Sequence, residues 1–165
     1  MCGLPFSGKT TLAKQLAQKL GFIRIDIDEI KFEKGYKNVS DDDVPNKMWE
    51  KIYDEMFKRI YNNLSKGKNV ISDKSNLEKD ERNRMQQSTR GEFPVKVIYI
   101  NILPETVRRR WLENKKDKKR FDISEKIFNE AIDALQEPSD DENIIIYDQT
   151  IPIEDWIKRN FYDSK

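Results

Sequence analysis

Histidine is absent from this 165-residue chain, and cysteine occurs once, at Cys2. Without imidazole, the chain cannot use the Ser–His or Cys–His pairs of nucleophilic catalysis, and it lacks the commonest nitrogen ligand of metal sites. One cysteine cannot form an internal disulfide, which is typical of proteins from a reducing compartment. Any chemistry must therefore depend on carboxylates, lysines, arginines, hydroxyls and backbone amides, and phosphoryl transfer needs only these groups.

Long apolar runs, repeats and Pro- or Gly-rich linkers are also missing. No apolar stretch approaches the length of a membrane span and the N-terminus has no signal-peptide pattern, so the sequence predicts a soluble, cytoplasmic protein with no membrane partner. The net charge of +1 gives no argument for nucleic-acid binding through bulk charge. The length and the 36% of apolar residues predict one domain, residues 1–165, with a modest core.

Apolar segments rich in β-branched residues alternate with helical patterns along the chain. The strand candidates are residues 22–27, 69–72, 95–102 and 143–147, and the helix candidates are residues 10–20, 45–65, 77–89, 104–114, 124–135 and 153–162. This alternation favours an α/β domain with a mostly parallel sheet. In such a sheet, ligands bind in the crevice outside the carboxyl ends of the strands.

Residues 3–10, Gly-Leu-Pro-Phe-Ser-Gly-Lys-Thr, fit the phosphate-binding pattern G-x4-G-K-[ST]. Its glycines let backbone N–H groups approach phosphate oxygens, and the positive end of the following helix faces the same anion. We expect Lys9 to reach the β- and γ-phosphates and Thr10 to offer its hydroxyl to Mg²⁺. The alternative is a Gly-rich turn before an ordinary helix. The predicted cofactors are ATP and Mg²⁺, with the nucleotide bound by Gly3, Leu4, Pro5, Phe6, Ser7, Gly8, Lys9, Thr10 and Thr11.

Only Met1 and Cys2 precede this loop, whereas a phosphate loop should follow the central strand of its sheet. Either the chain begins at an internal methionine or the sheet has lost that strand. We favour the first explanation, because a gap at the sheet centre would leave ladder groups on both neighbouring strands unpaired. The sequence therefore predicts a slot between the strands at residues 69–72 and 95–102.

Asp28 directly follows the second apolar segment, where it would face the same crevice as the phosphate loop. A carboxylate there can accept a proton from an attacking hydroxyl. One alternative is that Asp28 caps a short helix, and another is that Asp26, two residues earlier on the same side of the strand, is the base. Lys31, one turn further on, either neutralises an acceptor phosphate or is simply solvated.

Two further segments carry weaker signals. Asp73 ends an apolar strand, in the pattern of a carboxylate that holds Mg²⁺ through water, although a polar loop fits equally well. Residues 108–120 hold eight basic residues among thirteen. This density fits a solvated helix end, a patch that binds a nucleic-acid backbone, or a lid whose cations meet the transferring phosphoryl group. The phosphate loop upstream favours the lid.

Four stretches together resemble a known family: MCGLPFSGKTTLAKQLA, RIDIDEIK, NVISDKSNLEKDER and PETVRRRW. They are similar to the P-loop kinases that include the kinase domain of polynucleotide 5′-hydroxyl kinase and related zeta-toxin-like kinases. The similarity covers almost the whole chain. It implies a three-layer P-loop kinase fold with a mostly parallel sheet of strand order 2-3-1-4-5, from which the first strand is largely missing here.

The resemblance also implies roles for individual residues. Asp28 is the implied general base, Lys31 and Arg82 lie on the acceptor side, and Asp73 joins Thr10 at the metal. The segment that follows Asp73 is one residue longer than the family pattern, which leaves the place of its asparagine open.

The resemblance places the lid at residues 108–122, with Arg110 as its first arginine. Where a second arginine is common, this chain has Asn114. Lys115 or Arg120 would have to take over that role, and lysine is a poorer bidentate phosphate clamp than arginine. The implied catalytic cations are therefore Lys9, Arg110, Lys115 and Arg120.

We therefore predict an ATP-dependent kinase that transfers the γ-phosphoryl group to a hydroxyl of an acceptor. The sequence leaves the acceptor open among nucleic-acid ends, nucleotides and small molecules, and residues 32–44 are where we expect its specificity to lie. One alternative from another class is an ATP-binding regulatory protein with little or no transfer. Another is a nucleic-acid-binding protein that uses the basic lid, for which binding would depend steeply on salt.

Overall fold

The computed structural model describes residues 1–117 and 122–163, which form an α/β domain. Its strands are β1 (Ile23–Asp26), β2 (Val70–Asp73), β3 (Val97–Ile100) and β4 (Ile144–Tyr147). Its α-helices are α1 (Lys9–Leu20), α2 (Ile27–Glu33), α3 (Asn46–Leu64), α4 (Lys79–Gln87), α5 (Pro104–Asp117), α6 (Glu125–Asp133) and α7 (Ile153–Ile157). Apart from the short helix α2, which is not among the predicted helices, strands and helices follow one another in the order that the sequence pattern predicts.

The last helix differs from the prediction of one continuous helix over residues 153–162. α7 ends at Ile157, and Lys158–Tyr162 forms a π-helix. Trp156, Ile157 and the π-helical Phe161 all face the same core. The spacing of apolar residues indicates which side chains are buried. Over so short a segment it could not distinguish an α-helix from a π-helix.

Parallel pairing joins β1 to β2 and β3 to β4, with Asp26 opposite Asp73 at the carboxyl ends of the first pair. Among the described residues these pairs are separate two-stranded sheets, so the strand order 2-3-1-4-5 stays a prediction. Cys2 lies against β3: its N–H donates to the Ile98 carbonyl at 2.8 Å, and its carbonyl accepts from the Ile100 N–H at 2.9 Å.

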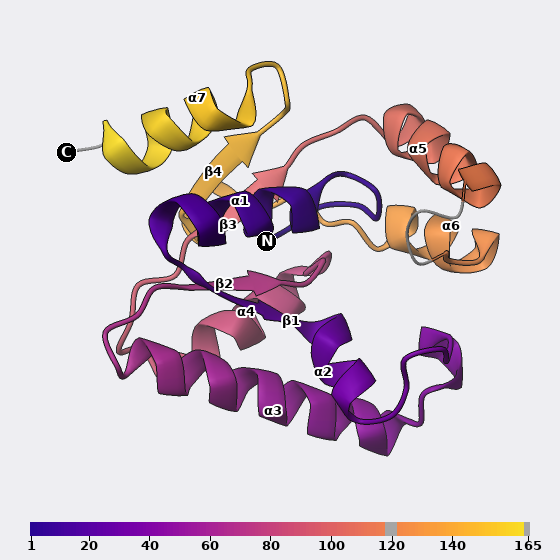
Figure 1. The fold of residues 1–165 in the computed structure, drawn as a ribbon, viewed down its shortest axis with the longest axis horizontal. Coiled ribbons are helices and arrows are strands. Elements are labelled where there is room, and N and C mark those ends of the chain that lie inside the picture. The colour runs from indigo at the N-terminus through magenta and orange to yellow at the C-terminus, as the bar shows by residue number, and fades with distance from the viewer. Residues whose placement is uncertain (118–121, 164–165) are drawn as a thin grey trace.

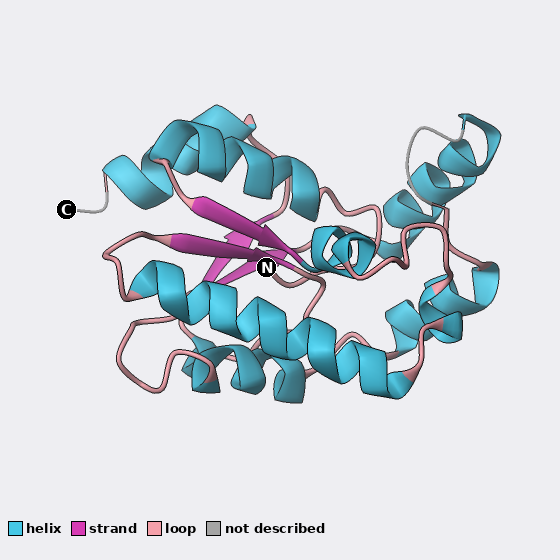
Figure 2. Cartoon of the chain, turned by 60° about the horizontal axis from the view of Figure 1, so that its bottom comes forward, coloured by secondary structure: helices cyan, strands magenta, loops and turns pink. Residues whose placement is uncertain are grey.

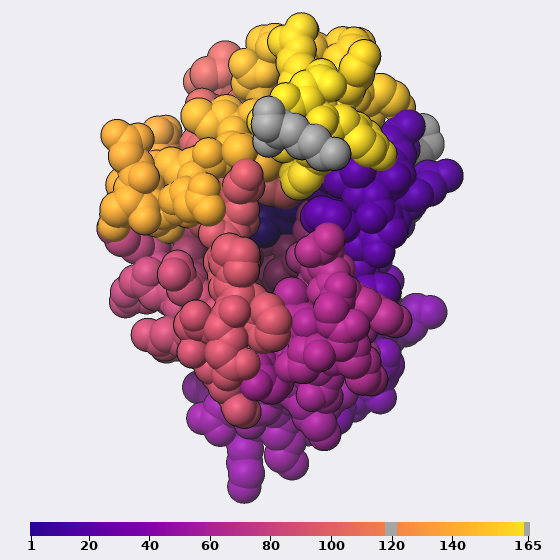
Figure 3. Space-filling model, turned by 90° about the vertical axis from the view of Figure 1, so that its left-hand side faces the viewer, coloured from indigo at the N-terminus to yellow at the C-terminus, as the bar shows by residue number. Residues whose placement is uncertain are grey.

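A slot lies between β2 and β3, as predicted from the short segment before the phosphate loop. Its volume is about 290 Å³, and it is lined by Met1 and by residues of both strands, including Ile71 and Ile98. Figure 3 shows this opening as a hollow, with indigo atoms from the N-terminal part of the chain deep inside. The Met1 ammonium donates to the Ser72 carbonyl at 3.2 Å, and burial lowers the pKa of this amino group to about 6.

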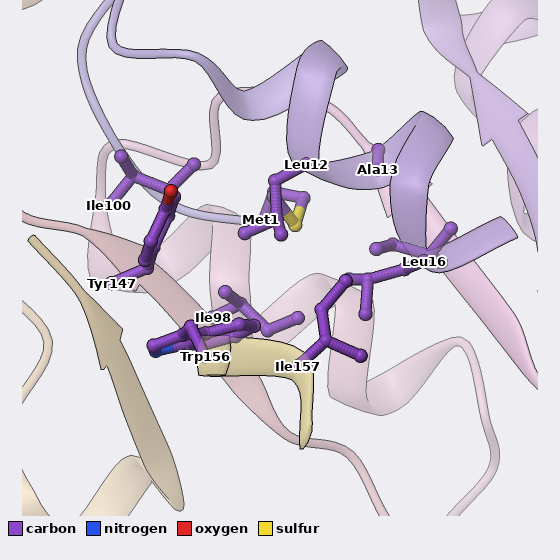
Figure 4. Close-up of a cluster of buried hydrophobic side chains, with 10 residues drawn as sticks. Met1, Leu12, Ala13, Leu16, Ile98, Ile100, Tyr147, Trp156 and Ile157 are labelled. Atoms are coloured by element: carbon purple, nitrogen blue, oxygen red, sulfur yellow. The ribbon is translucent and has the colours of Figure 1, made fainter. Parts of the chain in front are cut away.

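Helices lie on both sides of the strands, which gives the predicted three layers (Figures 1 and 2). On one side, Leu12 and Leu16 of α1 pack with Trp156 of α7 against the strands (Figure 4). On the other side, Ile52 and Met56 of α3 belong to a second apolar cluster that includes residues of β1 and α2. The apolar residues named in α1 and in α3 recur at intervals of four in the sequence, so each of these two helices buries one apolar face.

A third apolar cluster holds the phosphate loop against the end of the molecule formed by α5 and α6. Leu4 of the loop packs there with Val107, Trp111 and Phe128, and the last two rings are stacked with centroids 4.7 Å apart. This contact fixes the loop relative to the segment that carries the predicted lid. Among the described residues, no helix is long and apolar enough to cross a membrane.

Candidate active site

The phosphate loop runs from Cys2 to the start of α1 in a conformation that requires glycine at two places. Gly3 has φ 146°, and a Cβ there would lie 3.0 Å from the Ile100 carbonyl oxygen. Gly8 has φ 107°, and a Cβ there would lie 3.0 Å from the Gln149 amide nitrogen. The positive φ disfavours other residues at both positions, and at Gly3 the main chain of Ile100 also leaves too little room for a Cβ. The result is the cradle of main-chain groups that the sequence motif predicts.

Lys9 is bent back over this cradle. Its ammonium donates to the main-chain carbonyls of Gly3 at 2.9 Å and Leu4 at 2.7 Å. Burial lowers the pKa of Lys9 to about 8, which shows that its charge is poorly compensated by the protein. A phosphate group would supply the missing negative charge, so the loop fits the triphosphate of ATP.

Thr10 and Asp73 lie together at the start of α1 and the end of β2. The Thr10 hydroxyl donates to Asp73 Oδ1 at 3.3 Å, and Asp73 is almost fully buried. Within the described residues no cluster of three or more histidines, cysteines and acidic residues could hold a metal by itself. A hydroxyl and one carboxylate are nevertheless a suitable set for Mg²⁺, which binds through few protein oxygens together with water and phosphate.

Arg24 neutralises the acidic groups at this strand edge, and sequence reasoning missed it. Its guanidinium donates to Asp73 Oδ2 at 2.8 Å and to Glu29 at 2.8 Å, and it pairs with Asp26. The signal was present in the sequence, because Arg24 and Asp26 are two residues apart and point to the same side of β1. Arg24 thus positions the carboxylate that we assign to Mg²⁺.

Asp26 and Asp28 have different surroundings. Asp26 is the N-cap of α2: its Oδ1 accepts from the Asp28 N–H at 2.9 Å, and its other oxygen pairs with Arg24. The alternative of Asp28 as the helix cap is therefore wrong. The side chain of Asp28 opens onto the cavity beside the loop, where loss of water and the nearby charges of Asp26 and Asp41 raise its pKa to about 6. This value suits a base that works near neutral pH.

Lys31 is buried on the acceptor side of the same cavity. Its ammonium donates to Asp41 Oδ1 at 2.5 Å and to the Val39 carbonyl at 2.6 Å, and it lies 5.9 Å from the centroid of the Trp49 ring. Asp41 belongs to the 3₁₀ helix η1 (Asp41–Asp43), inside the segment 32–44 to which the sequence assigned specificity. The solvated alternative for Lys31 is thus wrong, since its side chain is 1% exposed.

Arg82 does not line this cavity, although the resemblance placed it on the acceptor side. It is buried on α4, where it forms a two-bond ion pair with Glu142 at 2.6 and 3.0 Å. It also donates to the main-chain carbonyls of Asn76 and Leu77. Asn76 in turn donates to the Met1 carbonyl at 2.8 Å. These bonds hold the slot and the chain start together, which is a structural role.

The basic segment reaches the phosphate loop through Arg110. Its guanidinium donates to the main-chain carbonyls of Phe6 and Ser7 at 3.4 and 3.3 Å, and to Gln149 at 2.8 Å. Gln149 also donates to the Ser7 carbonyl at 2.6 Å. No sequence motif marks Gln149, which follows β4, so its contact with the loop was not predicted.

Of the other two predicted lid cations, the structure describes only Lys115. The Lys115 ammonium lies 4.5 Å from the centroid of the Trp111 ring. Arg120 and the part of the lid at residues 118–121 lie outside the described residues. Arg110 is therefore the lid cation whose place beside the loop can be described.

A single cavity of about 650 Å³ brings the phosphate loop and the acceptor side together. Phe6, Lys9, Thr10 and Thr11 line one part of it, and Asp73 lies at its strand edge. The rest is lined from α2, η1, α3 and α6 and includes Asp28, Lys31, Asp41, Trp49, Tyr53, Ile127 and Ala131. Phosphate-binding groups and a carboxylate of raised pKa therefore line one cavity that is open to solvent, as a transferase for phosphoryl groups requires.

Known proteins support the class that the fold and cavity define. The chain belongs to the AAA domain family, whose pattern matches residues 1–138. A shikimate kinase from Persephonella marina (strain DSM 14350 / EX-H1) is 30% identical over 139 residues, which are 79% of this chain and 83% of that protein. The chain is thus a P-loop kinase, as its motifs indicated.

Solved structures share this fold at low sequence identity. A sugar kinase from Janibacter sp. HTCC2649 has a TM-score of 0.70 at 18% identity, with 96% of this chain and 88% of that chain covered. Kti12 from Chaetomium thermophilum, in complex with ADP-AlF3, has a TM-score of 0.74 at 17% identity, with 96% and 92% covered. These similarities confirm the predicted α/β P-loop kinase fold.

Proposed function

We propose that this kinase transfers the γ-phosphoryl group of Mg·ATP to a hydroxyl of an acceptor bound beside Asp28. The observation that carries this proposal is the shared cavity, in which Lys9 and Thr10 of the loop and Asp28 line one space. The main-chain groups of the loop and Lys9 would hold the triphosphate, and Thr10 and Asp73 would hold Mg²⁺, whose charge would offset that of the phosphates. Asp28 accepts the proton of the acceptor hydroxyl as the phosphoryl group moves.

Lys9→Ala is the test of the nucleotide site. We expect ATP-dependent transfer to be lost and Mg·ATP binding, measured by calorimetry, to weaken strongly, because the Lys9 ammonium lies at the main-chain carbonyls of Gly3 and Leu4, where it would meet the phosphates. Lys19→Ala is the matched control, since Lys19 ends the same helix and pairs with Glu154 on the surface. An unchanged affinity in Lys9→Ala would contradict the phosphate-loop assignment.

Arg110→Ala tests the lid. We expect turnover to fall more than ground-state affinity for ATP, because a cation beside the transferring group matters most when charge develops in the transition state. Arg109→Ala is the matched control, since Arg109 is the exposed neighbour on the same helix. Lys115→Ala and Arg120→Ala complete the series. If all three lid variants keep wild-type turnover, the basic segment is only a solvated surface.

A second candidate function is nucleotide binding without phosphoryl transfer to an acceptor. The structural similarity to Kti12, which was solved with ADP-AlF3, is the reason for retaining this second candidate function. The two candidates differ at Asp28, because replacing a proton acceptor stops transfer and leaves nucleotide binding intact. A chain that binds Mg·ATP and phosphorylates nothing in an acceptor screen would support the second candidate.

A further inference from the structure

The acceptor side of the cavity, meaning the part lined by Asp28, Lys31, Asp41, Trp49 and Tyr53, has an unusual set of charges. Two of these residues are carboxylates that face the space, and no arginine is among the described residues that line it. Arginine is the common partner of carboxylate and phosphate groups, because its guanidinium forms two parallel hydrogen bonds with them. The described part of this wall therefore lacks the side chain best suited to an anionic acceptor.

Two lysines that line the cavity near these residues, Lys31 and Lys74, are already held by carboxylates, while Lys14 lines the cavity from α1. Lys31 donates to Asp41 at 2.5 Å, and Lys74 pairs with Glu81. An anionic acceptor group would have to compete with those carboxylates for the two ammonium groups. It would also approach Asp28, and like charges repel more strongly where water is partly excluded. The electrostatics of this wall therefore oppose a carboxylate or phosphate near the reacting hydroxyl.

Aromatic and apolar side chains line the same part of the cavity, with the Lys31 ammonium 5.9 Å from the centroid of the Trp49 ring and the Lys74 ammonium 5.5 Å from that of the Tyr53 ring. Trp49 and Tyr53 of α3 have ring centroids 6.0 Å apart, and Ile127 and Ala131 of α6 line the cavity as well. The Trp49 indole N–H donates to the Asp41 carbonyl at 3.2 Å, so the ring is fixed. Aromatic faces pack against the C–H face of a saturated ring, while carboxylates accept hydrogen bonds from its hydroxyls.

We propose that the acceptor is an uncharged hydroxylated ring, of the sugar or cyclic-polyol class. Its apolar face packs on the side formed by Trp49 and Tyr53, and its hydroxyls donate to Asp28 and Asp41. The hydroxyl that donates to Asp28 is the one that attacks the γ-phosphate. This inference rests on the proposed function and adds the chemical class of the acceptor to it.

Pairs of acceptors that differ in one charged group test the proposal directly. Suitable pairs are glucose with glucuronate, glucose with glucose 6-phosphate, and methyl shikimate with shikimate. With γ-labelled ATP, we expect kcat/KM for the uncharged member to exceed that of its anionic partner by at least about tenfold, the effect of about 1.4 kcal/mol of repulsion. A preference for the anionic members would overturn the proposal while leaving the kinase function intact.

Asp41→Asn tests whether the wall causes the discrimination. Removing this carboxylate should lower the ratio of kcat/KM between the uncharged and the anionic member of each pair to about threefold or less. One repelling charge is lost, and the charge of Lys31 is less neutralised. Asp43→Asn is the matched control: it lies in the same 3₁₀ helix, is exposed and does not line the cavity. Equal ratios in the two variants would show that the wall does not select acceptors. Thermal melting of both variants checks that they are folded.

Trp49→Leu tests the aromatic side. We expect a higher KM for the uncharged ring, with unchanged affinity for Mg·ATP.

A binding experiment separates the inference about the acceptor class from the proposed kinase function. In it, calorimetry measures the binding of the same acceptor pairs in the presence of Mg²⁺ and a nonhydrolysable ATP analogue. If the uncharged members bind but are never phosphorylated, the proposed ligand class is supported and the kinase function is contradicted. If no uncharged ring binds, the acceptor class is wrong.

Discussion

Replacing Asp28 by asparagine should lower phosphoryl transfer by about 10²- to 10⁴-fold, the usual effect of losing general acid–base catalysis. Asparagine has the same size but cannot take the proton of the acceptor hydroxyl. The affinity for Mg·ATP should stay nearly unchanged, because the loop and Lys9 hold the triphosphate. The helix α2 should also be unaffected, since its cap is Asp26. Steady-state kinetics and calorimetry on one preparation measure the two effects.

Asp26→Asn distinguishes the two aspartates. Asparagine caps a helix about as well as aspartate does, so α2 should remain intact in this variant. Loss of transfer in Asp26→Asn but not in Asp28→Asn would move the base two residues upstream. Full activity in Asp28→Asn would contradict the role assigned to this residue, whatever the second variant does.

The raised pKa of Asp28, about 6, also predicts how activity and stability depend on pH. Transfer should rise as pH increases through about 6, because only the ionised carboxylate accepts a proton, and Asp28→Asn should lose this limb. For stability the sign is opposite. Between the ordinary aspartate pKa and about 6, the folded chain keeps a proton that the unfolded chain has lost, so stability falls as pH rises through that window. Asp28→Asn should therefore be at least as stable as wild type at pH 7.

A short apolar extension before Met1, such as five residues rich in valine and isoleucine, should raise the melting temperature by about 10 °C. Each buried β-branched side chain contributes roughly 1.5–3 kcal/mol before the entropy of ordering, and about 1 kcal/mol shifts a domain of this size by 2–4 °C. The extension would fill the slot of about 290 Å³ and pair with the facing edges of β2 and β3.

An extension of glycine and serine is the matched control, because it moves the terminal charge without adding apolar surface. The amino group of Met1 has a folded pKa of about 6 against 8.0 ordinarily. The unfolded chain thus binds more protons between these values, and stability should rise with pH across this window. Either extension should abolish that rise. A melting temperature unaffected by the apolar extension, or β2 and β3 found directly hydrogen-bonded, would contradict the slot.

Local sequence patterns predicted most of the fold. The phosphate loop, the following helix and the alternation of strands and helices all depend on residues within one or two turns of each other. The position of Asp28 follows from the same short range, because a residue just after a parallel strand must lie at the carboxyl edge of the sheet.

Contacts between distant residues were decided only by the tertiary structure. Arg82 meets Glu142 across 60 positions and Arg110 meets Gln149 across 39, and no periodicity encodes which charged side chain finds which partner. Arg24 donates a hydrogen bond to Asp73 only because β1 and β2 pair in one particular register. Sequence alone thus determined which chemical groups are available to this protein and at which positions along the chain they lie. Packing decided which of those groups share a cavity, because burial and side-chain direction depend on every element around them.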